Sequence, residues 1–190
     1  MVKLGKFFYR WRGVIGFIAF WLTFFLSRPY SKTIFFSLPI ILVGLLLRFW
    51  AGGYIGKTAR SNELDGEVIV ENGPYRFLRN PLYLGNFFLT FGVLLALNPP
   101  VFYQVLVIIL FWIYYGIIIK SEQNYLEQKF GERYRVYCKT VSAILPSFRQ
   151  KKILAKNQKF DFRTAQREFQ TIVIIVVIYG LIYLKAVRKI

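Results

Sequence analysis

The sequence predicts an all-α fold: a polytopic membrane helical bundle that forms one domain over residues 1–190. Three observations support this prediction. Of the residues, 56% are hydrophobic and 19% are aromatic, and the apolar residues gather in five runs. A helix needs about 20 apolar residues to cross a bilayer, and the runs fall near or somewhat below this length. They cover residues 13–27, 33–51, 82–97, 101–119 and 170–187.

The formal net charge of +17 is distributed unevenly along the chain. Residues 120–168 carry twelve Lys or Arg against five acidic residues, and four cations precede the first run: Lys3, Lys6, Arg10 and Arg12. Loops rich in Lys and Arg remain in the cytosol, so we predict that the N-terminus, residues 48–82 and residues 120–168 face the cytosol. This orientation would send Lys185, Arg188 and Lys189 outward. The last run could instead lie in the interface or return, so its course stays open.

In a soluble protein, such a charge would suggest binding to nucleic acid, but the apolar runs argue against that class. We expect the basic segment 149–167 to lie on anionic lipid headgroups, where each cation contributes about 1 kcal/mol. A protein or RNA partner is the alternative. The first run ends at Ser27-Arg28-Pro29 without a small-x-small cleavage site, which favours an uncleaved membrane anchor.

The chain contains no histidine and a single cysteine, Cys138. These counts exclude an internal disulfide, histidine-based metal sites and nucleophiles paired with histidine. We therefore expect no metal site, and we interpret Cys138 as an inert thiol.

Turn signals define how the runs connect. Asn98-Pro99-Pro100 predicts a tight turn, so 82–97 and 101–119 should form an antiparallel helical hairpin. We expect its second helix to continue past Lys120 to about Phe130, with Gly131 directly after its end. Before the hairpin, residues 67–71 read as a short extended piece.

Two polar clusters lie at the same end of this hairpin. The first is GPYRFLRNPLYLGN, residues 73–86, and the second is SEQNYLEQKFGERYRVY, residues 121–137. Helices of similar length on both sides of the turn would bring Asn80 and Tyr83 close to Lys120 and Glu122. Taken singly, the arginines would be headgroup anchors, the tyrosines an aromatic belt and the prolines helix starts. Their joint placement instead predicts one pocket, lined by Arg79, Asn80, Tyr83, Glu122 and Gln123.

These residues resemble a known family, the integral-membrane methyltransferases. That group includes isoprenylcysteine carboxyl methyltransferases and phosphatidylethanolamine N-methyltransferases. The resemblance covers about residues 48–140. It is carried by Gly73, Tyr75, Arg79, Asn80, Pro81, Tyr83 and Gly85, followed by Glu122, Gln123, Leu126, Phe130, Gly131, Tyr134 and Tyr137.

The resemblance implies that S-adenosylmethionine is bound at the cytosolic face and that its methyl group goes to a lipid-like or isoprenylated acceptor from the bilayer. By position, the cofactor would contact Tyr75, Arg79, Asn80, Pro81, Tyr83, Glu122 and Gln123, with backbone contacts from Glu67, Val68, Ile69 and Val70. Glu122 suits an ammonium, and Arg79 suits a carboxylate. Lys120 is a candidate for binding the acceptor. No catalytic residue is assigned.

The sequence departs from the family pattern at two positions. Asn80 stands where many relatives have histidine, and an amide cannot take up a proton. Ile118 stands where relatives that methylate a carboxylate have arginine, which argues against such an acceptor. Carboxylate, amine and thiol acceptors all remain open. The rival classes are an NADPH-dependent sterol-type membrane reductase and a non-catalytic membrane protein that organises lipids.

Overall fold

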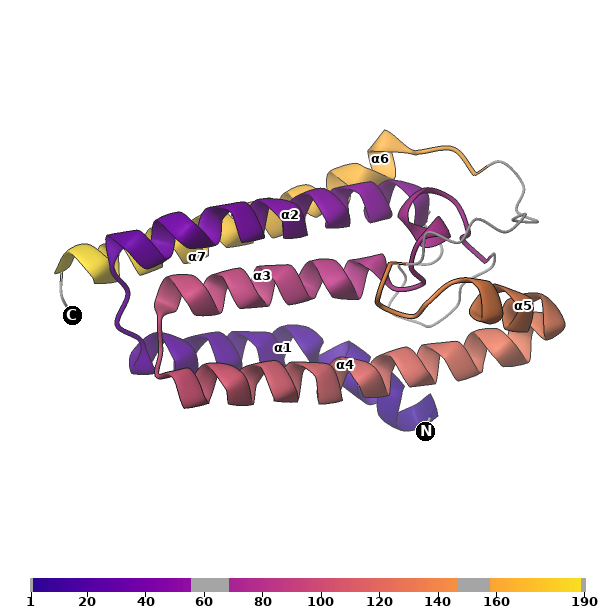
Figure 1. The fold of residues 1–190 in the computed structure, drawn as a ribbon, viewed down its shortest axis with the longest axis horizontal. Helices are drawn as coiled ribbons and strands as arrows, with labels where there is room; N and C mark the ends of the chain where they lie inside the picture. The colour runs from indigo at the N-terminus through magenta and orange to yellow at the C-terminus, as the bar shows by residue number, and fades with distance from the viewer. Residues whose placement is uncertain (1, 56–68, 147–157, 189–190) are drawn as a thin grey trace.

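Five long helices dominate the computed structural model, which describes residues 2–55, 69–146 and 158–188. They are α1 (Val2–Leu26), α2 (Ser31–Ile55), α3 (Pro81–Leu97), α4 (Val101–Phe130) and α7 (Phe169–Arg188), shown in Figure 1. The short helices in these residues are η2 (Gly73–Arg76), α5 (Glu132–Thr140), α6 (Phe162–Ala165) and η3 (Gln166–Glu168). The described residues contain no strand, so the all-α prediction is confirmed.

Fewer helices qualify as membrane spans than the sequence led us to expect. By length and composition, three stretches of the described residues qualify: α2, α4 and the continuous stretch Phe162–Val187. α3 is apolar but has only 17 residues. α1 has 25 residues, but Lys6, Arg10 and Arg12 make its first half polar. All five predicted runs are helical, yet five apolar spans is too high a count.

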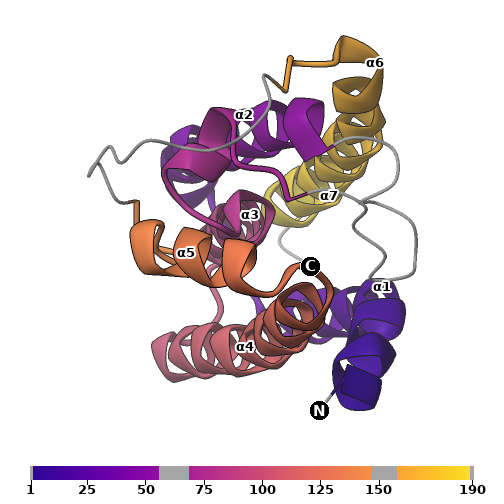
Figure 2. The same ribbon diagram turned by 90° about the vertical axis from the view of Figure 1, so that its right-hand side faces the viewer.

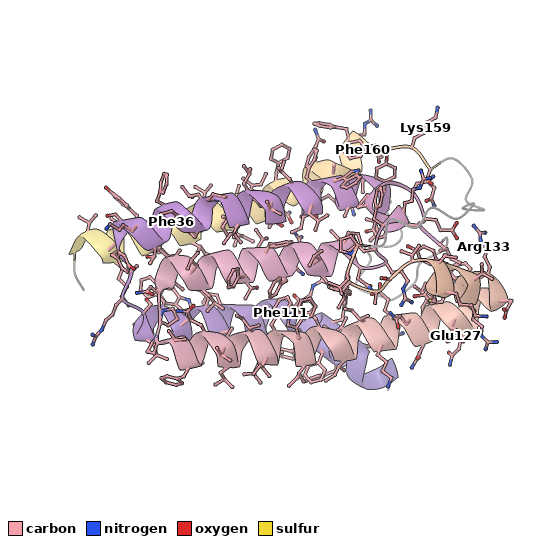
Figure 3. All side chains as sticks on the ribbon, viewed as in Figure 1. Phe36, Phe111, Glu127, Arg133, Lys159 and Phe160 are labelled. Carbon is pink, nitrogen blue, oxygen red and sulfur yellow. The ribbon has the colours of Figure 1, made fainter. Side chains whose placement is uncertain are left out.

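The helices run lengthwise, and the two ends of the bundle differ. The short connections 27–30 and 98–100 lie at one end together with the C-terminus (Figure 1). The N-terminus, η2, α5 and α6 lie at the other end, which we call the polar end. Glu127, Arg133 and Lys159 are at this end, whereas Phe36 and Phe111 lie along the length of the bundle (Figure 3).

α7 begins at the polar end and runs the length of the bundle in the same direction as α3 (Figure 1). The last apolar run therefore does not turn back. Seen from the polar end, α2, α3 and α7 lie on one side of the bundle, and α1 and α4 lie on the other (Figure 2). We refer to these groups as the two layers.

The turn that joins α3 to α4 has the predicted form. Asn98 adopts a left-handed conformation, with φ 49° and ψ 54°, and its N–H donates to Leu94 O at 2.9 Å. The two prolines that follow cannot continue the helix. α4 extends past Lys120 and ends at Phe130, followed by Gly131 with a φ of 56°. The hairpin and its end are therefore confirmed.

α2 and α3 share the most extensive helix–helix contact of the described residues, and glycines permit it. A Cβ atom on Gly92 would lie 2.7 Å from Cγ1 of Ile41, and one on Gly85 would lie 2.5 Å from Cγ of Arg48. Because lipid tails are as apolar as leucine, the hydrophobic effect does not hold helices together in a membrane. Close approach of the two backbones instead stabilises the pair through van der Waals contacts.

Lys185 ties α7 to α1 at the end away from the polar end. Its Nζ donates to Phe24 O and to Ser27 Oγ, the latter at 3.2 Å, and lies 4.6 Å from the centre of the Phe24 ring. The ammonium therefore lies at the C-terminus of α1, where positive charge is favourable. Of the three cations that left the course of the last run open, Lys185 is thus buried inside the protein.

We expect Gly92→Ala to destabilise the bundle by about 1–3 kcal/mol, because the added methyl group overpacks the contact with Ile41. Gly116 on α4 is the matched control, since a Cβ there meets nothing within 4 Å in the described residues. Gly116→Ala should leave stability unchanged or raise it slightly. Unfolding of both variants in detergent measures this difference, and equal stabilities would contradict the packing described here.

Candidate functional site

The loop before α3 is held against the segment that follows α5. The backbone N–H of Arg79 donates to Ser142 O at 2.9 Å, and Nδ2 of Asn80 donates to Ala143 O at 2.9 Å. Pro81 then begins α3, at a position where a missing N–H removes no helical hydrogen bond. The irregular backbone thereby obtains partners within the protein, as buried non-helical backbone in a membrane protein requires.

The hairpin brings Tyr83 and Glu122 into direct contact, as its geometry predicted. Tyr83 OH donates to Glu122 Oε2 at 3.1 Å. The tyrosine is buried against Ile118, and its ring centre lies 5.1 Å from that of Tyr115. The hydroxyl therefore fixes the direction in which the Glu122 carboxylate points.

A cavity of about 480 Å³ surrounds this pair at the polar end, between the two layers. Six of the residues predicted for the site line it: Tyr75, Arg79, Asn80, Pro81, Tyr83 and Glu122. Further lining residues were not predicted, among them Arg12, Arg48, Asn86, Tyr115, Arg167 and Glu168. The cavity thus receives side chains from both ends of the sequence as well as from the hairpin.

The other predicted site residues lie elsewhere. Gln123 and the exposed Lys120 are not among the described residues that line the cavity. Ile69 packs against Tyr134 and Tyr137 instead, and its carbonyl accepts a hydrogen bond from Gln158 at 3.2 Å. Val70 does not line the cavity either, while Glu67 and Val68 fall outside the described residues. The roles assigned to these residues stay predictions.

Arg79 presents unmet hydrogen-bonding capacity to the cavity. Its Nη1 contacts Cys138 Sγ, a weak acceptor, and its buried Nε has no hydrogen-bond partner in the described part of the chain. No carboxylate of the described residues lies within ion-pair distance of this guanidinium. A buried donor without a partner is costly, so Arg79 favours an acceptor group on a ligand.

A buried ion pair closes the cavity on the side of α7. Nη2 of Arg48 lies 2.7 Å from Oε2 of Glu168, whose side chain is 4% exposed. Arg48 also donates to Oδ1 of Asn86, and Asn86 donates to Tyr115 OH at 3.1 Å. Thr171 Oγ1 donates to Glu168 Oε2 at 3.3 Å. This network joins α2, α3, α4 and the start of α7.

Some of the unpredicted residues left signals in the sequence. Arg48 stands inside the apolar run 33–51, and a charge within such a run generally marks a functional position. Glu168 is an acid in an otherwise basic segment. Arg12 was read only as a charge that orients the N-terminus. Nothing in the sequence indicated that these three residues meet at the hairpin.

Glu71 is buried where the loop before η2 meets α5. Its side chain is 5% exposed, and one of its carboxylate oxygens lies 3.8 Å from Nε of Arg133. Its backbone N–H donates to Oε1 of Gln158 at 3.2 Å. Burial raises the pKa of the Glu71 carboxyl, and the positive charge of Arg133 offsets part of this rise.

The fold and this site together define an integral membrane protein of the helical class, with a polar cavity at one end of the bundle. Acidic, basic and aromatic side chains converge on that cavity from α1, α2, α3 and α4, from η2 and η3, and from the loop before α3. A cavity of this kind is typical of a binding site for a small polar molecule.

Comparison with known proteins assigns a family. The phospholipid methyltransferase family model matches residues 32–133, which is more than half of the chain. The chain belongs to the phospholipid methyltransferase family.

Named relatives agree with this assignment. Protein-S-isoprenylcysteine O-methyltransferase from Dictyostelium discoideum is 32% identical over 146 residues, which cover 70% of this chain and 58% of that protein. Protein-S-isoprenylcysteine O-methyltransferase A from Arabidopsis thaliana is 28% identical over 58% of each chain. The enzyme of that name from Rattus norvegicus is 28% identical over 62% of this chain and 42% of the rat protein. The chain spans about half the length of these relatives. No solved structure matches it.

Substituting either Arg48 or Glu168 alone should lower the free energy of unfolding far more than substituting both residues together. We expect Arg48→Met or Glu168→Met alone to destabilise the protein by about 3–5 kcal/mol, because each leaves an uncompensated buried charge. The double variant should recover most of that loss. A double-mutant cycle on unfolding in detergent measures the coupling, and additive effects would contradict it.

Glu71 should make stability depend on pH. Its pKa is raised in the folded protein above the ordinary value of 4.5. Its favourable contribution is therefore present below that value and is lost as pH rises through the folded pKa. Glu71→Gln should remove this loss, whereas Glu132→Gln, at a position 69% exposed, should not. Thermal unfolding between about pH 4 and about pH 8 checks the prediction; parallel curves for the wild type and Glu71→Gln would contradict it.

Proposed function

We propose that the chain is a membrane methyltransferase that uses S-adenosylmethionine and methylates a lipid-like or isoprenylated acceptor. We place its active site at the cavity of the polar end, on the cytosolic face. The main observation in support of this proposal is the hydrogen bond between Tyr83 and Glu122 in the wall of the cavity. The names of the relatives support the reaction class and an isoprenylated acceptor.

The residues present fit S-adenosylmethionine in size and chemistry. A volume of about 480 Å³ lies within the range of about 300–1,000 Å³ that small-molecule sites occupy. The cofactor carries an ammonium and a carboxylate on the same carbon. Glu122 would hold the ammonium, and Arg79 would hold the carboxylate. Nε of Arg79 lacks a partner within the described residues, and its Nη1 contacts only the weak acceptor Cys138 Sγ. Tyr75 and Asn80 would flank the adenosine.

When bound, the cofactor supplies a methyl group to an in-line displacement. The contribution of this chain is to align the reacting groups and to exclude water, and alignment alone can contribute about 7–11 kcal/mol. The hydrogen bond from Tyr83 keeps Glu122 in one orientation. The network around Arg48 closes the cavity on the side of α7. No histidine stands ready to remove a proton, which favours an acceptor that is already ionised.

The cytosolic placement follows from the distribution of charge. The N-terminus, α5 and α6 lie at the polar end (Figure 1), and residues 1–12 and 131–168 carry most of the cations. Such segments remain in the cytosol, where a soluble cofactor reaches the cavity directly. We further propose that the basic segment 149–167 lies on anionic headgroups at this face.

Glu122→Ala should weaken binding of S-adenosylmethionine by roughly 10- to 100-fold, because it removes a charged partner of the ammonium. Calorimetry on the purified protein in detergent measures the affinity. Glu127→Ala is the matched control: Glu127 lies on the same helix but pairs with Arg135 at the surface, at 2.6 Å. This variant should bind the cofactor normally.

The same calorimetry tests the rival class. If the wild type binds NADPH tightly and shows no saturable binding of S-adenosylmethionine, the proposed function is wrong and a reductase is favoured. If Glu122→Ala folds and binds the cofactor as the wild type does, the cavity is assigned to the wrong ligand.

A further inference from the structure

Two exposed segments complete the cavity wall. α1 contributes Arg12 and Gly13, and the stretch from η3 into α7 contributes Arg167 and Gln170. These four are the exposed residues among the described cavity-lining residues, whereas the others are half-buried or buried. The described part of the cavity therefore opens between α1 and α7. These helices belong to different layers, and both lie toward the right of the view from the polar end (Figure 2).

The opening is positively charged. Four arginines and two glutamates line the cavity, and the pair of Arg48 and Glu168 neutralises itself at 2.7 Å. Neither Arg12 nor Arg167 lies within ion-pair distance of a carboxylate of the described residues. A cationic group that entered between Arg12 and Arg167 would be repelled by several kcal/mol at close range in a partly desolvated site, so these residues favour an anionic ligand.

Arg12 is held in a defined position. Its guanidinium carbon lies 3.9 Å from the centre of the Tyr9 ring, so a cation–π contact orients it. Its positive charge also acts on Glu122 and Tyr83, which places it within electrostatic reach of the centre of the site. A planar guanidinium with unused donors matches the geometry of a carboxylate.

The surface beside the opening is apolar. On α1, Val14, Phe17 and Ile18 are exposed, and on α7 Val173 and Ile174 are exposed. Both helices run from the opening away from the polar end (Figure 1). A ligand with a charged head at the arginines would thus lay an apolar chain along these helices, in the lipid.

We propose that Arg12 and Arg167 determine acceptor specificity by binding the ionised carboxylate of an acidic amphiphile that enters between α1 and α7. This inference rests on the proposed function. Both residues lie outside the stretch 32–133 that matches the family model. The carboxylate is the group that receives the methyl.

The reaction balances without a base. A carboxylate oxygen forms a bond to the methyl carbon while the carbon–sulfur bond of the donor breaks, and the electron pair of that bond remains on sulfur. No proton moves, which suits a chain without histidine. The product is a neutral methyl ester, which has lost its attraction to the two arginines and leaves toward the lipid.

The test compares N-acetyl-S-farnesylcysteine, which carries a carboxylate, with its uncharged carboxamide and with phosphatidylethanolamine. The wild type in lipid nanodiscs should methylate the acid. The carboxamide should inhibit methylation of the acid with an inhibition constant at least about tenfold higher than the KM of the acid. The uncharged carboxamide lacks the carboxylate, and a hydrogen bond to a charged group contributes about 1.5–3 kcal/mol. This comparison needs no variant, so it remains valid if a substitution prevents folding.

Arg12→Gln and Arg167→Gln should each raise KM for the acid about tenfold, leave kcat within about twofold, and leave the affinity for S-adenosylmethionine unchanged. Arg12→Lys should restore part of the loss, because it keeps the charge but not the fork of donors. Arg10→Gln and Arg163→Gln are matched controls: both residues are exposed and neither lines the described cavity, so their KM should stay at the wild-type value.

Two failures are distinguishable. If the protein binds no S-adenosylmethionine by calorimetry, the proposed function is wrong. Three other results overturn the specificity inference but not the methyltransferase assignment. The first is a carboxamide that binds as well as the acid, and the second is a preference for the aminolipid as acceptor. The third is a wild-type KM in the Arg12 and Arg167 variants.

Discussion

The ion pair between Arg48 and Glu168 is the contact on which the cavity depends. A charge at this depth is tolerated only when paired and hydrogen-bonded, and here each charge obtains its partner from the other half of the chain. The glycines of α2 and α3 let the two helices approach so closely that Arg48 reaches Asn86. Through Asn86 the network continues to Tyr115 on α4. One pair thus sets the positions of α2, α3, α4 and η3 around a common space.

The sequence predicted those parts of the site that depend on local geometry. The turn at Asn98 and the similar lengths of the flanking helices suffice to bring Tyr83 opposite Glu122, and Gly131 marks the end of α4. The predicted number of spans was too high because α3 has only 17 residues and because charged residues interrupt the first half of α1. Arg12, Arg48 and Glu168 escaped prediction because their meeting depends on how separate helices cross. No periodicity in a single segment encodes that crossing.

The family assignment and the cavity divide the chain in similar ways. Residues 32–133 match the family model and contain the hairpin, Arg79, Asn80 and the contact of Tyr83 with Glu122. The exposed rim of the cavity comes from α1 and from η3 with α7, which lie outside that stretch. On the proposed assignment, residues within the matched stretch hold the methyl donor, and Arg12 and Arg167 on either side of it select the acceptor. Ile118 is buried among apolar side chains, so on this proposal the cation that binds the acceptor would come from another helix.

The contact of Lys185 with the C-terminus of α1 has a mechanical consequence for the opposite end. α1 and α7 are joined there by Lys185, Phe24 and Ile182, and they diverge toward the opening. Arg12 lies twelve residues from Phe24, a distance of about 18 Å along a helix. A tilt of α1 by about 10° around this fixed point would move Arg12 by about 3 Å. Because the two helices are joined at the end away from the polar end, a small tilt of α1 there would change the width of the opening, and the residues of α3 and α4 in the proposed donor site would not have to move.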